Sequence, residues 1–193
     1  ELGRFDKAEA SLRQAIALKA DFAEAHNNLG ITLKELGRLD EAEESLRQAL
    51  ALKPDHANAH NNLGATLQEL ERLDEAETAF TQAIALKPDY AEAHSNLGVT
   101  LQELGRLEES EASHNQAIVL NPNFAEAYYN LGVTLQQLGR LEDAETSYKQ
   151  AIVLRSDYAE AHSNLGMTLQ ELGLLDEAES NFLKAITLKP DYA

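Results

Sequence analysis

Leucine and alanine recur along the chain at helical spacing. Within residues 23–56 the first apolar stripe is Leu29, Leu33 and Leu36, with intervals of four and three residues. Gly37 ends this stretch. The second stripe comprises Ala42, Leu46, Ala49 and Leu50, and Pro54 stops it. Val, Ile and Thr form no long alternating runs, so strands are not expected. The pattern therefore predicts two helices joined by a short turn.

This pair of helices repeats every 34 residues. One series of glycines is Gly30, Gly64, Gly98, Gly132 and Gly166; a second is Gly3, Gly37, Gly105, Gly139 and Gly173, with Glu71 in its one gap. The complete repeats are 23–56, 57–90, 91–124, 125–158 and 159–192, and residues 1–22 form a partial repeat that holds only the second helix. We expect a single array over residues 1–193, all-α, with eleven helices stacked as a solenoid.

Gly30 and its counterparts fall inside the first helix of each repeat. Glycine costs about 1 kcal/mol relative to alanine in a helix interior, so a position that keeps it in five repeats must gain something elsewhere. We expect the backbone of the first helix to lie in close contact with the second helix at this point.

Charge and composition exclude several classes of protein. The chain has 33 acidic and 16 basic residues, a net charge of −17, which argues against binding nucleic acid or an anionic membrane surface. It has no cysteine, hence no disulfide, cysteine-based zinc site or thiol nucleophile. Charged residues interrupt the apolar ones too evenly for a transmembrane span.

The repeated residues also carry a family resemblance. Residues 125–158 contain Tyr128, Leu131, Gly132, Leu135, Ala144, Tyr148 and Ala151, and residues 57–90 contain Leu63, Gly64, Leu67, Ala76, Phe80, Ala83 and Pro88. In these positions the chain resembles the tetratricopeptide repeat (TPR) family over essentially its whole length. The departures are His26, His60, His94 and His162 in place of the first aromatic residue, together with Ser110 and His114. The resemblance implies a right-handed α-solenoid that serves as a protein-interaction scaffold, with the first helices lining a concave groove.

One groove position is asparagine in every complete repeat: Asn28, Asn62, Asn96, Asn130 and Asn164. Five amides in register suggest an asparagine ladder that could satisfy both the N–H and the C=O groups of an extended peptide. This is similar to the TPR arms of O-linked N-acetylglucosamine transferases, where such asparagines hold a peptide backbone. The alternative is structural, with the asparagines bonding to neighbouring repeats.

The side chains at the flanking groove positions indicate which kind of partner to expect. An apolar strip comprises Ile31, Ala65, Val99, Val133 and Met167, and beside it lie Lys34, Gln68, Gln102, Gln136 and Gln170. Acidic residues predominate at two further positions: Glu35, Glu69, Glu103 and Glu171, and Glu24, Glu92, Glu126 and Glu160 near the helix starts. We expect a protein or peptide partner with an extended, neutral or basic segment. TPR domains that grip acidic C-termini need several Lys and Arg residues on the inner face, whereas these groove positions hold only Lys34.

No catalytic constellation, cofactor site or metal site is expected. The histidines recur one repeat apart, about 10 Å by helix-packing distances, whereas a bound metal lies about 2 Å from its ligands. Two alternatives to a peptide-binding scaffold stay open. The array could assemble head to tail into oligomers or filaments, because the helix over Leu175–Leu188 should expose Ala178, Phe182 and Ile186. It could also be the substrate-recruiting arm of a larger transferase.

Overall fold

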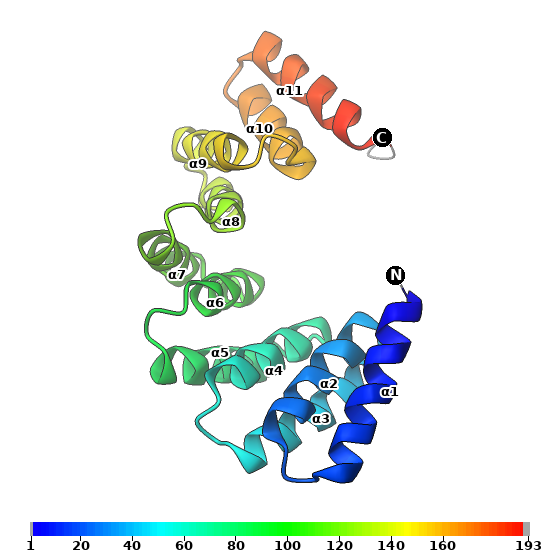
Figure 1. Cartoon of the computed structure of the whole chain (residues 1–193). Coiled ribbons are helices and arrows are strands. Elements are labelled where there is room, and N and C mark those ends of the chain that lie inside the picture. Colours follow the sequence, from blue (N-terminus) through cyan, green and yellow to red (C-terminus); the bar gives the residue numbers. More distant parts are fainter. Residues whose placement is uncertain (1, 191–193) are drawn as a thin grey trace. The chain divides into compact units, whose positions relative to one another are not determined.

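The computed structural model describes the backbone of residues 2–190 and the side chains from Arg4 onward. Over this range it contains helices and no strand (Figure 1). The eleven helices are α1 (Leu2–Leu18), α2 (Ala23–Glu35), α3 (Leu39–Leu52), α4 (Ala57–Glu69), α5 (Leu73–Leu86), α6 (Ala91–Glu103), α7 (Leu107–Leu120), α8 (Ala125–Gln137), α9 (Leu141–Leu154), α10 (Ala159–Glu171) and α11 (Leu175–Leu188). The predicted all-α class, built of helix-turn-helix repeats, is confirmed.

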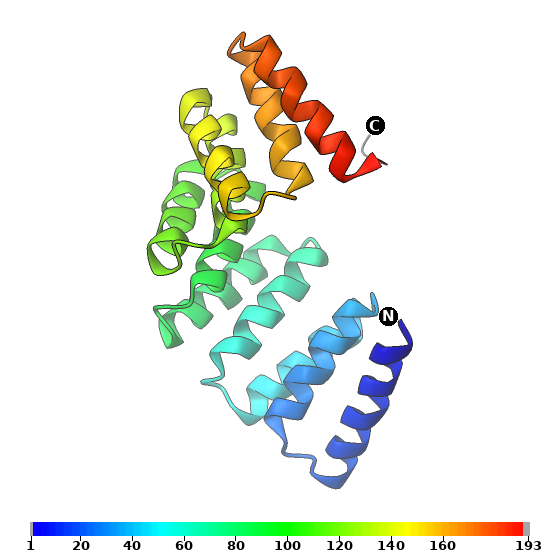
Figure 2. The same ribbon diagram turned by 45° about the horizontal axis from the view of Figure 1, so that its top comes forward.

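The even-numbered helices are the first helices of the repeats. The helices α2, α4, α8 and α10 each run antiparallel to the second helix that follows (Figure 2). Residues 1–100 and residues 101–193 form two compact units, called the first unit and the second unit below. The single array over residues 1–193 stays a prediction.

The interior glycines lie directly against the second helix, as expected. A Cβ atom added to Gly64 would lie 2.7 Å from the ring of Phe80, and one added to Gly132 would lie 2.6 Å from the ring of Tyr148. Both rings are fully buried, so neither has free space into which it could move. The glycine therefore allows an aromatic ring to pack against the helix backbone.

The turn inside each repeat needs a left-handed backbone. Gly37 has φ 72°, and the bond from Arg38 N–H to Leu33 O (2.9 Å) closes the turn in a Schellman motif. Glu71 occupies the same position in the next repeat with φ 58°, a conformation that side chains with a Cβ disfavour.

Replacing Glu71 by glycine is expected to stabilise the protein by about 1 kcal/mol, because it removes the steric cost of the left-handed conformation. The free energy of unfolding from urea denaturation measures this. The converse change, Gly105→Glu, serves as the matched control and is expected to destabilise by a similar amount. A destabilising Glu71→Gly would contradict the assignment of strain to this turn.

The helix α7 has a more polar core than its counterparts. Ser110 is fully buried, and its Oγ lies 3.0 Å from Oγ1 of Thr134 on α8. His114 is also fully buried, and neither ring nitrogen has a hydrogen-bond partner among the described residues. Burial lowers the pKa of His114 to about 4. The equivalent residues of the other complete repeats are Leu46, Phe80, Tyr148 and Phe182.

Exposed apolar side chains lie on α11, although not all of the expected ones. Leu175 is 63% exposed, Leu183 is 58% exposed and Ile186 is 45% exposed. The expectation for Phe182 is wrong, because this ring is half-buried against the core of the second unit. The expectation for Ala178 is also wrong, because this residue is buried in that core. Its counterparts Ala76 and Ala144 are buried in the same way, since this position packs within its own helix pair.

Candidate functional site

The asparagines predicted as a ladder lie at equivalent places on the first helices. We call the surface formed by these asparagines and their flanking groove residues the ladder face. In the first unit it comes from α2, α4 and the start of α6, and in the second unit from the end of α6, α8 and α10. Asn28 is exposed, whereas Asn62, Asn96, Asn130 and Asn164 are half-buried.

Most ladder amides bond to the preceding repeat. Asn62 Nδ2 donates to Asn27 Oδ1 at 2.9 Å, and Asn96 Nδ2 donates to Asn61 Oδ1 at 3.1 Å. In the second unit Asn164 Nδ2 donates to the hydroxyl of Tyr129 at 3.1 Å. One N–H of each of these three amides is therefore used as the alternative interpretation expected, in a hydrogen bond to a neighbouring repeat.

The remaining polar atoms determine what the ladder can offer a ligand. The Oδ1 atoms of Asn62 and Asn96 have no hydrogen-bond partner among the described residues, and each Nδ2 keeps a second N–H. At Asn28 the oxygen is engaged instead of an N–H, because its Oδ1 accepts a bond from Asn27 Nδ2 at 3.2 Å. The first asparagine thus presents donors, and the next two present an acceptor and a donor. The engaged N–H groups also fix the orientation of the amides.

The residues that hold the ladder were missed at the sequence level. Asn27 and Asn61 precede ladder positions and are buried, and Tyr129 takes their place in the second unit. A threonine four residues after each ladder asparagine also recurs, and its Oγ1 bonds back to the ladder carbonyl, as in Thr66 to Asn62 O (2.9 Å). Both signals were present in the 34-residue frame, as the Asn-Asn pairs and the repeated threonine.

Other predicted ladder-face residues bond to one another. Lys34 Nζ lies 2.8 Å from Glu69 Oε1, so the one basic side chain of this set is already paired. Gln136 Nε2 donates to Glu171 Oε1 at 3.2 Å, and Gln136 Oε1 accepts from the Tyr148 hydroxyl at 3.1 Å. The remaining glutamines are accessible: Gln68 and Gln102 are half-buried, and Gln170 is exposed.

The apolar strip is accessible in both units. Ile31 is 37% exposed and Met167 is 42% exposed, while Ala65, Val99 and Val133 are half-buried. These side chains provide a moderate apolar surface beside the asparagines, of the kind that contacts the side chains of a bound chain.

The glutamates near the starts of the first helices, called the acidic rim below, carry less net charge than the sequence indicates, because basic side chains pair with them. Glu24 lies 3.4 Å from Lys53, Glu126 lies 2.9 Å from Arg155, and Glu160 lies 3.2 Å from Lys189. The pKa of Glu160 is lowered by a hydrogen bond from its own backbone N–H and then by Lys189. Each basic partner follows its glutamate by 29 residues, so the same pair recurs in the 34-residue frame of the sequence. The exposed carboxylates Glu35 and Glu103 keep the ladder face acidic.

The described part of the chain holds neither a membrane-spanning helix nor a cluster of metal-binding side chains. Within it, no helix combines the length and apolar character needed to cross a membrane. No group of three or more His, Asp or Glu side chains in that part is arranged to hold a metal ion.

Comparisons with known proteins agree with the geometry. Tetratricopeptide repeat family models match residues 21–89, 67–116 and 159–192, and a TPR repeat model matches residues 1–37, 102–139 and 134–173. No curated protein sequence matches the chain. The helix pairs and the matches together define an α-helical repeat protein of the protein-interaction scaffold class. The chain belongs to the tetratricopeptide repeat family.

Several solved structures share the fold. The type IV pilus biogenesis factor PilW is 26% identical with a TM-score of 0.89, over 98% of this chain and 87% of that one. PilF of Pseudomonas aeruginosa is 23% identical with a TM-score of 0.85, over 97% and 86%. YrrB, described as a TPR protein with an unusual peptide-binding site, is 24% identical with a TM-score of 0.70, over 94% and 93%.

Proposed function

We propose that this protein is a non-catalytic scaffold that binds an extended polypeptide segment along the ladder face. The observation that carries the proposal is the repetition of partly unsatisfied amides at Asn28, Asn62 and Asn96. An extended backbone has N–H and C=O groups that need partners along its whole length. Amides repeated at equivalent positions supply such partners without reading the side chains of the ligand.

The charges of the ladder face favour a neutral or basic segment. Lys34 is engaged by Glu69, while Glu35 and Glu103 are exposed, so the net field favours ligand cations. The apolar strip at Ile31 and Val99 would contact small apolar side chains. The description of YrrB as a peptide-binding TPR protein is consistent with this use of the fold.

The double variant Asn62→Ala/Asn96→Ala is expected to weaken binding of a fluorescently labelled, unstructured peptide of serine, alanine and lysine by about tenfold. This corresponds to the loss of one to two hydrogen bonds at about 1 kcal/mol each. Fluorescence anisotropy measures the affinity. Thr81→Ala, an exposed change on α5 of the same unit, is the matched control. Equal affinity of the double variant and the control would contradict the proposal.

The preference for basic segments is tested separately. At low salt, the lysine-bearing peptide is expected to bind more tightly than the same peptide with glutamate in place of lysine, and the difference should shrink as salt screens the charges. Equal affinities of the two peptides at low salt would refute the electrostatic part of the proposal.

The exposed apolar side chains of α11 favour a second candidate function, end-to-end assembly of the array. Leu175, Leu183 and Ile186 together offer an apolar surface for another copy. Light scattering over a dilution series measures it: assembly predicts a mass that rises with concentration and falls in Leu183→Lys. A constant monomer mass would exclude this candidate.

A further inference from the structure

The position before the ladder asparagine is a tyrosine in one repeat. This residue is Tyr129 on α8, and its equivalents in the other complete repeats are Asn27, Asn61, Ser95 and Ser163. Tyr129 precedes Val133 of the apolar strip by four residues, so the two side chains lie on the same side of the helix. Its hydroxyl accepts the hydrogen bond from Asn164 Nδ2 at 3.1 Å. The ladder face of the second unit therefore has an aromatic ring beside its asparagines.

Neighbouring side chains hold the ring of Tyr129 in place. Its centroid lies 5.9 Å from that of Tyr148, a fully buried ring of α9, with an angle of 50° between the two planes. It lies 5.0 Å from the centroid of Tyr158, in the turn before α10, with an angle of 37°. A side chain that is already held by its neighbours loses little conformational entropy when a ligand binds to it.

The rings of Tyr129 and Tyr158 keep exposed area. Both residues are half-buried, so part of each side chain is accessible from solvent. Met167 of the apolar strip lies three residues after Asn164 on α10 and is 42% exposed. A ligand on the ladder face can therefore reach both aromatic and aliphatic carbon atoms in the second unit.

The charges next to these rings are balanced. Arg155 Cζ lies 3.6 Å from the ring centroid of Tyr158, and Arg155 Nη2 lies 2.9 Å from Glu126 Oε1. One cation thus faces one carboxylate, and a cationic side chain of a ligand would compete with Arg155 for the ring of Tyr158. A neutral aromatic side chain does not, and aromatic rings pair favourably in tilted arrangements at centroid distances of about 4.5 to 7 Å.

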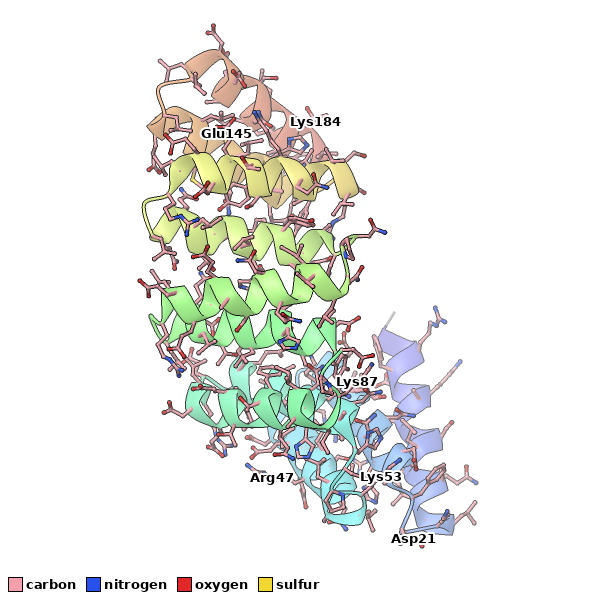
Figure 3. All side chains as sticks on the ribbon, turned by 90° about the vertical axis from the view of Figure 1, so that its left-hand side faces the viewer. Asp21, Arg47, Lys53, Lys87, Glu145 and Lys184 are labelled. Carbon is pink, nitrogen blue, oxygen red and sulfur yellow. The ribbon has the colours of Figure 1, made fainter. Side chains whose placement is uncertain are left out.

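The first unit offers the matched comparison. Tyr90, in the turn before α6, is the equivalent of Tyr158, and Nζ of Lys87, labelled in Figure 3, lies 4.3 Å from its ring centroid. The equivalent of Tyr129 is Asn61, whose Oδ1 holds the following ladder amide at 3.1 Å. Both units therefore support a ladder amide at this position, and the second unit does so with an aromatic residue.

We propose that Tyr129 and Tyr158 form an aromatic subsite of the ladder face, which binds one aromatic side chain of the extended segment. The inference rests on the proposed function and adds a preference at one position of the ligand. The ladder amides bind a backbone without reading its sequence, whereas this subsite selects phenylalanine, tyrosine or tryptophan in the second unit.

The experiment compares the peptide of serine, alanine and lysine with a second peptide in which phenylalanine replaces its central alanine. Wild-type protein is expected to bind the phenylalanine peptide about fivefold more tightly in fluorescence anisotropy, which is the scale of one aromatic pair. Tyr129→Asn introduces the residue that the chain carries at Asn61, so it keeps an acceptor for Asn164 and removes the ring. This variant is expected to bind both peptides equally, with unchanged affinity for the alanine peptide.

Two further variants separate the ring from the rest of the fold. Tyr129→Phe keeps the ring without its hydroxyl and is expected to keep the preference for phenylalanine. Thr146→Ala, an exposed change on α9 of the same repeat, is expected to leave both affinities unchanged. A role of Tyr129 in stability alone would change the free energy of unfolding of Tyr129→Asn without changing the ratio of the two affinities.

The possible failures are distinguishable. Equal binding of the two peptides to wild type, or a preference that survives in Tyr129→Asn, would overturn the aromatic subsite and leave the proposed function standing. If wild type binds neither peptide, the proposed function fails and the subsite fails with it.

Discussion

Replacing Phe80 by alanine is expected to destabilise the protein by about 3 to 5 kcal/mol, because the ring is fully buried and its removal leaves a cavity. Gly64→Ala alone is expected to cost about 1 to 3 kcal/mol, because the new Cβ would lie 2.7 Å from that ring. The free energy of unfolding from urea denaturation, followed by circular dichroism, measures both.

The combination of the two changes gives the sharper test. In the Phe80→Ala background, Gly64→Ala no longer meets a ring and is expected to stabilise by about 1 kcal/mol, since alanine is the better helix former. The effect of the same substitution thus changes sign with its neighbour. Additive effects of the two changes would show that close packing on the ring is not the reason for the glycine.

Replacing His114 by phenylalanine is expected to stabilise the protein by about 1 to 3 kcal/mol at neutral pH. The imidazole is fully buried, and neither nitrogen has a hydrogen-bond partner within the described part of the chain, a cost that an aromatic hydrocarbon does not carry. The equivalent side chains Phe80 and Phe182 show that the repeat accommodates this ring. Chemical denaturation at pH 7.5 measures the gain.

The same variant should lose an acid sensitivity of the wild-type protein. Burial lowers the pKa of His114 from 6.5 to about 4, so between these values the unfolded chain binds the proton and the folded one does not. Protonation of His114 therefore leaves the free energy of unfolding unchanged above about pH 6.5. It lowers this free energy by about 3 kcal/mol as the pH drops to 4. His94→Phe controls for the general loss of a histidine. Identical pH profiles of wild type and His114→Phe would contradict this account.

Repetition made most of the fold predictable from the sequence. Any single helix-turn-helix pattern is weak, but Gly64 and Gly132 recur at the same place in a 34-residue frame and predicted a close contact that the structure confirms. The predicted exposure of Ala178 was wrong, because the apolar stripe of a helix does not show which neighbouring helix covers each of its residues. Glu71 shows a further limit, because its left-handed backbone follows from its place in the turn and not from its own preference.

The candidate site was only partly predictable. The sequence located the asparagines but not the direction of their amides, which depends on Asn27, Asn61 and Tyr129 in the preceding repeats. The charge of the rim was overestimated for a similar reason. Lys53 and Arg155 are distant in sequence from the glutamates that they neutralise, and only the fold brings them within 4 Å.

The side-chain amide signals of the ladder asparagines test the central claim most directly. In ¹⁵N-labelled protein titrated with the lysine-bearing extended peptide, the Nδ2 signals of Asn62 and Asn96 are expected to shift and saturate together. The Nε2 signals of Gln48 on α3 and Gln82 on α5, both exposed on second helices, should stay unchanged. Binding that leaves the ladder signals unmoved, or that shifts only the glutamines, would contradict the assignment of the ladder face as the binding site.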